Sequence, residues 1–169
     1  MKKRAALHNL GCKVNAYETE AMRQLLEEDG YEIVPFEPGA DVYVINTCTV
    51  TNIADRKSRQ MLHKARKMNP DAIVVAAGCY VETADGGVEK DPAIDIILGN
   101  NQKNQLVSVI RDFEQKRAGK RAEEPSGAMT KKIDINHTKE YENLIIDRTE
   151  NRTRADIKVQ DGCNQFCTY

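Results

Sequence analysis

Five cysteines are the residues of this sequence best suited to carry chemistry. They occupy positions 12, 48, 79, 163 and 167. Their number is odd, and Met1–Arg4 leads into a strand-like stretch rather than a secretion signal, so a disulfide framework is not indicated. Metal binding or catalysis is favoured instead, because thiolates are preferred ligands of zinc and iron–sulfur clusters.

Three of these cysteines follow apolar runs at the same relative position. Cys12, Cys48 and Cys79 each come just after a run that we expect to be a buried strand. Reactive groups collect beyond the carboxyl ends of parallel strands, so the three thiols are expected to meet at one edge of a sheet. The alternative is three small buried residues, and spacing alone does not decide between these interpretations. The runs are 5–10, 42–46 and 72–77.

The alternation of apolar runs with amphipathic segments predicts the fold that positions these cysteines. It is typical of an α/β fold with a flavodoxin-like parallel sheet and helices on both faces. One feature conflicts with this order: only seven residues, 35–41, join two of the strands, whereas a parallel crossover usually needs about a dozen. The place of strand 42–46 in the sheet is therefore left open. The expected strands are 5–10, 31–34, 42–46, 72–77 and 95–98, and the expected helices are 17–29, 52–68 and 102–116.

The composition changes after a first domain that we expect to cover residues 1–116. Residues 117–143 are rich in charge, Gly, Ser and Pro, which predicts a linker or a surface hairpin. Residues 144–169 are expected to begin a second domain. Within them, Ala155–Val159 alternates like a strand and is followed by the Cys-x3-Cys pair of Cys163 and Cys167.

Several polar residues near the first three cysteines have two interpretations each. Asn9, Asn15 and Asn46 either donate hydrogen bonds to a bound metal centre or serve turns and caps. His8 and His63 are expected to be ordinary strand and helix residues, although imidazole is a common metal ligand.

The overall charge gives no sign of a nucleic-acid or membrane partner, since 25 Lys and Arg face 26 Asp and Glu. No run approaches the roughly 20 apolar residues of a membrane span, which predicts a soluble, cytoplasmic protein. The helix 52–68 is nevertheless basic. A solvated face is the preferred interpretation of its cations, and a phosphate-contacting surface is the alternative. They are Arg56, Lys57, Arg59, Lys64, Arg66 and Lys67.

Four segments together resemble the radical-SAM methylthiotransferases. They are 10–15 (LGCKVN), 46–51 (NTCTVT), 77–80 (AGCY) and 160–169 (QDGCNQFCTY). They occur in the family's order and span nearly the whole chain. The first segment is most similar to the branch that modifies N6-threonylcarbamoyladenosine in tRNA.

The resemblance implies an enzyme that uses S-adenosylmethionine and two [4Fe-4S] clusters. Cys12, Cys48 and Cys79 would ligate an auxiliary cluster in which one iron has no protein ligand. Cys163 and Cys167 would be the first two ligands of the radical-SAM cluster. The implied reaction converts N6-threonylcarbamoyladenosine at position 37 of tRNA to its 2-methylthio derivative. Its electron donor and sulfur source are not specified.

The third cysteine of the radical-SAM motif would follow Tyr169, where the sequence ends. We therefore expect an N-terminal fragment with the first strand of a truncated radical-SAM barrel. It should hold at most the auxiliary cluster and be inactive alone. The alternatives are a methylthiotransferase acting on isopentenyladenosine in tRNA or on a ribosomal protein, and a non-enzymatic, cysteine-bearing α/β metal-binding module.

Overall fold

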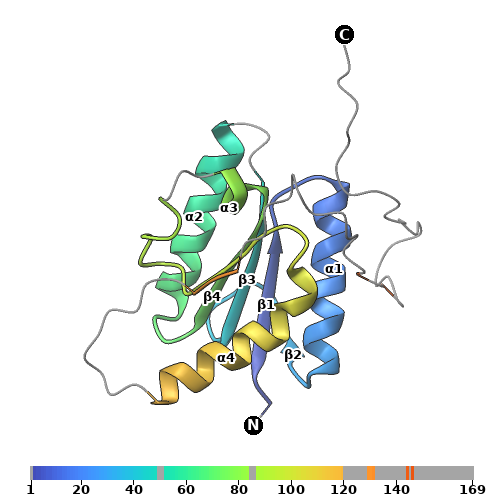
Figure 1. Ribbon diagram of the computed structural model, residues 1–169, viewed down its shortest axis with the longest axis vertical. Coiled ribbons are helices and arrows are strands. Elements are labelled where there is room, and N and C mark those ends of the chain that lie inside the picture. The colour runs from blue at the N-terminus through green and yellow to red at the C-terminus, as the bar shows by residue number, and fades with distance from the viewer. Residues whose placement is uncertain are drawn as a thin grey trace.

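Six strands form one sheet in the computed structural model of the chain (Figure 1). Their order is β2-β1-β3-β4-β5-β6, and every neighbouring pair is parallel. The structure describes residues 2–48, 52–83, 87–119, 129–131, 144 and 146. The strands are β1 (Arg4–Asn9), β2 (Glu32–Ile33), β3 (Val42–Thr47), β4 (Ile73–Gly78), β5 (Ile96–Leu98) and β6 (Met129–Lys131).

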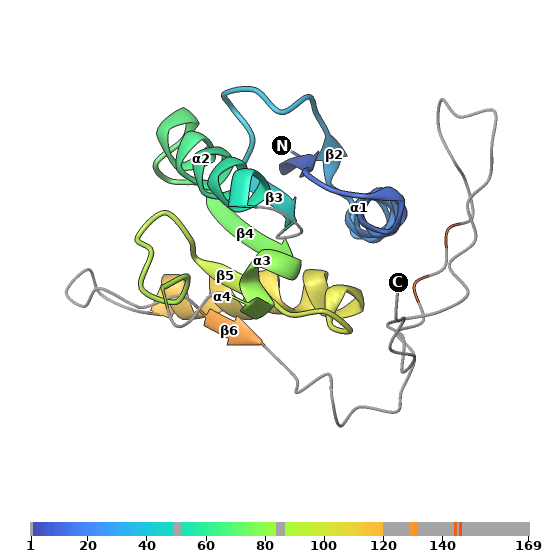
Figure 2. The ribbon, with the colours of Figure 1, turned by 90° about the horizontal axis from the view of Figure 1, so that it is seen from above.

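Helices cover both faces of this sheet (Figure 2). On one face, Met22 of α1 and Ile110 of α4 belong to the same core cluster. On the other face, Leu62 of α2 packs in a second cluster together with Val81 of α3. The helices are α1 (Lys13–Glu28), α2 (Asn52–Met68), α3 (Cys79–Thr83) and α4 (Leu106–Gly119), and the 3-10 turn η1 (Lys103–Gln105) leads into α4.

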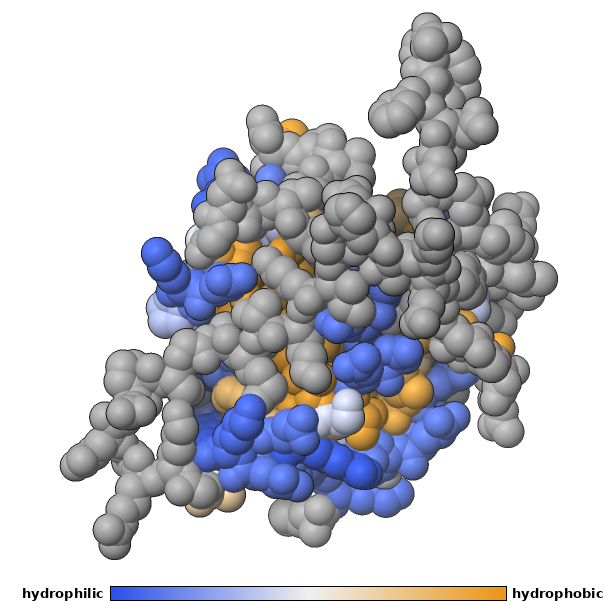
Figure 3. All heavy atoms as spheres, viewed as in Figure 1, coloured by the Kyte–Doolittle hydropathy of each residue, from blue (hydrophilic) through white to orange (hydrophobic). Residues whose placement is uncertain are grey.

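The central strands are enclosed between these layers. Every residue of β3 and β4 is buried, which explains why their sequences lack polar alternation. Described hydrophilic side chains lie along the lower part of the face drawn in Figure 3, where α4 runs, and apolar ones show between them. The predicted α/β, flavodoxin-like parallel sheet is therefore confirmed.

Helix α1 begins earlier than its apolar pattern predicts. The periodic positions start at Tyr17, but the helix starts at Lys13 with Cys12 as its N-cap residue. The first turn contributes a buried polar side chain, Asn15, to the interior. A pattern of apolar residues alone misses such a turn.

The short connection before β3 crosses over β1 without a helix. The Phe36 ring in this connection lies 5.0 Å from the ring of His8 in β1 and 5.4 Å from that of Tyr43 in β3. The Tyr43 hydroxyl also donates a hydrogen bond to the Glu37 carbonyl at 2.8 Å. These aromatic contacts cover the sheet where a helix would otherwise lie. Strand β3 consequently lies between β1 and β4.

Part of the segment 117–143, which we expected to be a linker or a hairpin, belongs to the sheet. Helix α4 continues to Gly119, and β6 pairs in parallel with β5, with Met129 opposite Ile96. An edge strand offers unpaired N–H and C=O groups, so a short segment can be recruited by backbone bonds alone. The strand expected at 155–159 lies outside the described residues.

Leu144 is buried, and its immediate neighbours in the chain lie outside the described residues. Its carbonyl accepts a hydrogen bond of 2.8 Å from the hydroxyl of Tyr17 in α1. None of the helices in the described ranges has the length and apolar character needed to cross a membrane.

Candidate cysteine site at the carboxyl edge of the sheet

The exits of three adjacent strands share one edge of the sheet. Strand β3 pairs with β1 on one side, where Asn46 lies opposite Asn9, and with β4 on the other, where Thr47 lies opposite Gly78. Cys48 and Cys79 follow these last paired residues directly, and α3 begins with Cys79 at the upper end of β4 in Figure 1. The predicted arrangement of three parallel neighbours with their exits at one sheet edge is therefore confirmed, whereas a shared ligand set of the three thiols stays a prediction.

The three thiols have different surroundings. Cys12 is exposed, Cys79 is half-buried and Cys48 is only 6% exposed. Burial raises the pKa of the Cys79 thiol; the Lys103 ammonium lowers it, and the Cys48, Glu18 and Cys12 groups raise it further. Cys79 therefore lies within electrostatic reach of both other thiols.

The side chains do not form a closed set of ligands as they stand. Within the described ranges, no group of three or more His, Cys, Asp and Glu side chains is arranged to hold a metal ion. The Cys12 thiol instead points to the Asn15 amide oxygen, at 3.4 Å. Soft thiolates suit an iron–sulfur cluster, so the donor chemistry fits, but the Cys12 side chain would have to leave Asn15 to join one.

Asn15 ties the start of α1 to the exit of β3. Its side-chain amide nitrogen donates to the backbone carbonyl of Thr47 at 2.8 Å. The backbone carbonyl of Asn15 accepts from the side-chain amide of Asn46 at 2.9 Å. Both asparagines are buried. These bonds join α1 to β3 and are neither a turn nor a cap, and a role of the asparagines toward a bound metal centre stays a prediction. The amide oxygen of Asn9 is buried and has no hydrogen-bond partner among the described residues.

Ser58 of α2 holds the main chain of Cys48. Its hydroxyl donates to the Cys48 carbonyl at 3.2 Å and accepts from the Cys48 amide at 3.3 Å. Ser58 is fully buried. The signal available in the sequence was a small polar residue at a position where the helix otherwise carries apolar side chains facing the sheet.

The glycines that precede Cys12 and Cys79 are required by close contacts. Gly78 has φ +95°, and a Cβ at this position would lie 2.4 Å from the Thr47 carbonyl oxygen. A Cβ on Gly11 would lie 2.5 Å from the Asn15 amide nitrogen. The repeated Gly-Cys pairs therefore let the three strand exits approach one another.

A buried ion pair lies beside the cysteines and was missed by sequence reasoning. The Lys103 ammonium lies 3.0 Å from the Glu18 carboxylate, with side-chain exposures of 0% and 7%. Lys103 also donates to the Asn100 side-chain oxygen at 2.9 Å. The only signal in the sequence was the polar run that follows strand β5, and it does not distinguish a buried lysine from a solvated one.

The remaining predicted site residues lie elsewhere. Cys163 and Cys167 are outside the described residues. His8 packs on Phe36, and burial, followed by the charge of Lys64, lowers its pKa. His63 lies 2.9 Å from the Asp91 carboxylate. Each histidine is thus engaged with a side chain other than a cysteine.

Known proteins resemble this chain over most of its length. The family model described as "Uncharacterized protein family UPF0004" matches residues 4–99, which include Cys12, Cys48 and Cys79. A relative from Bacillus subtilis (strain 168), named threonylcarbamoyladenosine tRNA methylthiotransferase MtaB, is 43% identical over 97% of this chain and 34% of its own length. The protein of that name from Aquifex aeolicus (strain VF5) is 37% identical over 98% of this chain and 38% of its own length.

A third relative has a different name. The tRNA-2-methylthio-N(6)-dimethylallyladenosine synthase of Ehrlichia canis (strain Jake) is 30% identical over 96% of this chain and 36% of its own length. The chain therefore spans about a third of the length of these curated relatives. It belongs to the UPF0004 family and is similar to the N-terminal third of proteins named MtaB methylthiotransferases.

Proposed function

We propose that this chain is the N-terminal part of a cytoplasmic tRNA methylthiotransferase and that Cys12, Cys48 and Cys79 ligate its auxiliary [4Fe-4S] cluster. The observation that carries the proposal is the meeting of three cysteine-bearing strand exits at one sheet edge. The names of the relatives support tRNA as the substrate of the whole protein. The higher identity to the MtaB relatives favours N6-threonylcarbamoyladenosine at position 37 as the modified nucleoside.

The residues around this edge have definite tasks in the proposal. Cys48 offers a ligand from a main chain that Ser58 holds in place. Cys12 reaches the same centre by exchanging its contact with the Asn15 amide for a metal bond. The Lys103 ammonium offsets negative charge that accumulates on three thiolates and sulfide. When bound, such a cluster supplies an iron without a protein ligand, at which a sulfur atom can be carried.

The other predicted groups complete the whole protein rather than this domain. Cys163 and Cys167 are proposed as the first two ligands of the radical-SAM cluster that cleaves S-adenosylmethionine. The 30% identical relative named for dimethylallyladenosine keeps isopentenyladenosine as the second candidate substrate. The chain alone, at about a third of its relatives' length, is expected to be inactive toward tRNA.

Anaerobic reconstitution of the chain with ferrous iron and sulfide tests the ligand set. We expect about four iron atoms per chain and the visible absorbance and EPR signals of a [4Fe-4S] cluster. Cys48→Ala should lose most of this absorbance, and Cys12→Ala and Cys79→Ala should lose it likewise.

The double variant Cys163→Ala, Cys167→Ala is the matched control, because it removes two thiols and leaves the first domain unchanged. It should retain the cluster of the unmodified chain. Full cluster content in Cys48→Ala would overturn the ligand assignment. Tight binding of zinc with no iron–sulfur assembly would favour a metal-binding module without this activity.

A further inference from the structure

Helix α2 presents a row of exposed cations to solvent. Their helical positions lie on the opposite side from Ser58, Leu62 and Ala65, which are buried against the sheet. Asp55 is the one acidic residue in the helix sequence, and one of its carboxylate oxygens is buried. We call the exposed cations the α2 basic face: Arg56, Lys57, Arg59, Lys64 and Lys67.

Several cations on the other side of the molecule are paired with carboxylates. In α1, Arg23 pairs with Glu20 at 2.6 Å, and beside α4 Lys3 pairs with Glu114 at 2.6 Å. Arg111 of α4 pairs with Asp29. No ion pair joins any residue of the α2 basic face to a carboxylate of the described residues.

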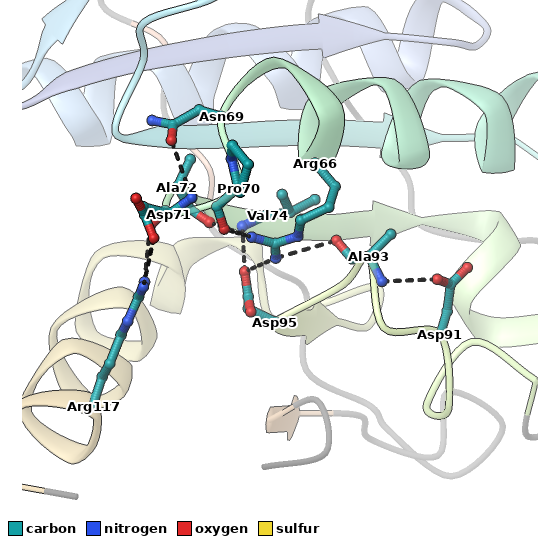
Figure 4. A network of polar contacts seen from close by, with 10 residues as sticks. All are labelled: Arg66, Asn69, Pro70, Asp71, Ala72, Val74, Asp91, Ala93, Asp95 and Arg117. Carbon is teal, nitrogen blue, oxygen red and sulfur yellow. Dashed lines mark hydrogen bonds and ion pairs between the residues drawn. The ribbon is translucent and has the colours of Figure 1, made fainter. Parts of the chain in front are cut away.

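Arg66, the sixth cation of the helix, has a structural role. Arg66 turns toward the sheet and donates to the Pro70 and Ala72 carbonyls, each at 2.8 Å (Figure 4). It also pairs with the Asp95 carboxylate. Arg66 therefore fixes the end of α2 to the neighbouring loop, whereas no side chain of the α2 basic face makes such a bond to another described residue.

The α2 basic face runs up to the cysteine edge. Helix α2 begins four residues after Cys48, at Asn52. Near that end, the charge of Arg59 lowers the pKa of Tyr80, the residue after Cys79, although burial raises this pKa more. From Arg56 to Lys67 the face is about 17 Å long at roughly 1.5 Å per residue.

The chemistry of this face fits a chain of phosphates. Separate, mobile Lys and Arg side chains along a helix neutralise successive phosphates of a nucleic-acid backbone. A bilayer fits less well, because an interfacial helix needs a free apolar face and that of α2, apart from the exposed Ile53, is buried against the sheet. We propose that the α2 basic face binds the phosphate backbone of the RNA substrate and leads it to the cysteine edge; this rests on the function proposed above.

Fluorescence anisotropy with a labelled anticodon stem-loop RNA, measured over a series of potassium chloride concentrations, tests this surface. The test variant combines Arg56→Gln, Lys57→Gln, Lys64→Gln and Lys67→Gln. We expect it to bind roughly 10- to 100-fold more weakly than the unmodified chain. The slope of log K against log salt should fall by about 0.7 for each single-strand phosphate that the variant no longer neutralises.

The matched control removes the same charge elsewhere and combines Lys2→Gln, Arg111→Gln, Lys116→Gln and Arg117→Gln. It should bind within about threefold of the unmodified chain, because long-range charge alone is largely screened by salt. Equal weakening of both variants, or no RNA binding by the unmodified chain, would overturn the proposal. So would binding to anionic phospholipid vesicles that depends on the α2 basic face when RNA binding does not.

A milder variant and a cluster assay distinguish loss of RNA contacts from unfolding and from loss of the cluster. The pair Lys57→Gln, Lys64→Gln should show an intermediate loss of RNA affinity if the fourfold variant unfolds. Cluster content after reconstitution is measured on the same variants and should be unchanged. A missing cluster in the unmodified chain would count against the proposed ligands, whereas normal cluster content with unchanged RNA affinity in the fourfold variant would count only against this surface.

Discussion

At the scale of single residues, the cysteine edge depends on glycines, which have no side chain, as much as on the three thiols. Gly78 has a positive φ, and its Cα lies against the Thr47 carbonyl, so that any side chain there would collide with backbone. Gly30, at the end of α1, has a similar φ of +89°, but nothing lies within 4 Å of a Cβ built on it. A comparison of these two glycines separates the free-energy cost of left-handed backbone from the free-energy cost of steric crowding.

Gly78→Ala should therefore destabilise the chain much more than Gly30→Ala. Left-handed backbone costs an alanine about 1–2 kcal/mol, and this is the whole expected cost at Gly30. Crowding at Gly78 should add about 1–3 kcal/mol. Urea unfolding followed by circular dichroism measures both values, and equal losses would show that the contact with Thr47 relaxes freely.

The buried pair of Lys103 and Glu18 marks the limit of sequence reasoning at this scale. The strand exits and their cysteines could be predicted, because each apolar run that stops just before a cysteine is visible within one segment. The ion pair could not be predicted, because it joins α1 to η1 across 85 positions. Each of its residues, taken alone, is of a type that usually lies on a solvated surface.

Breaking this pair from one side should be costly. Lys103→Met leaves the Glu18 carboxylate buried without its cation, which typically costs about 3–5 kcal/mol of unfolding free energy. Adding Glu18→Gln removes the charge and should recover more than half of the loss. Lys3→Met breaks an exposed pair and should cost under about 1 kcal/mol in the same denaturation experiment. A Lys103→Met cost as small as that of Lys3→Met would contradict this account.

At the scale of elements, the connection between β2 and β3 explains where a general rule fails. The rule that parallel strands need a long crossover assumes that a helix covers the sheet. Here Phe36 packs between His8 and Tyr43 and supplies that cover from an extended segment. The sequence carried these aromatic residues, but their meeting depends on the strand order, which no local pattern reveals.

This packing makes stability depend on pH through His8. Burial and the nearby Lys64 charge lower the pKa of His8 in the folded chain below its ordinary value of 6.5. As the pH falls below 6.5, the unfolded chain therefore binds a proton at this residue before the folded chain does, so stability decreases until the pH passes the folded pKa.

The variant His8→Gln cannot bind that proton, so it should lose less stability than the unmodified chain between about pH 7.5 and about pH 5.5. Thermal unfolding at several pH values measures this difference. His63→Gln is the control and should retain the His8 contribution. An identical pH profile for His8→Gln and the unmodified chain would show that His8 is not the group responsible.

At the scale of the whole molecule, the class of fold could be predicted from the sequence and is confirmed. The parallel sheet followed from alternating elements with strong apolar patterns. Strand β6 could not be predicted, because Met129–Lys131 has no strand pattern of its own and is recruited by the edge of β5. The proposed boundaries at 116 and 143 therefore remain predictions, as does the second domain at 144–169.

The contact of Leu144 with Tyr17 bears on how the domain presents its cysteines. Tyr17 lies in the second turn of the helix that follows Cys12, and it binds Leu144, which is 127 positions later in the sequence. The main chain of Leu144 is thus fixed close to the end of the helix that carries Cys12, the exposed one of the three thiols.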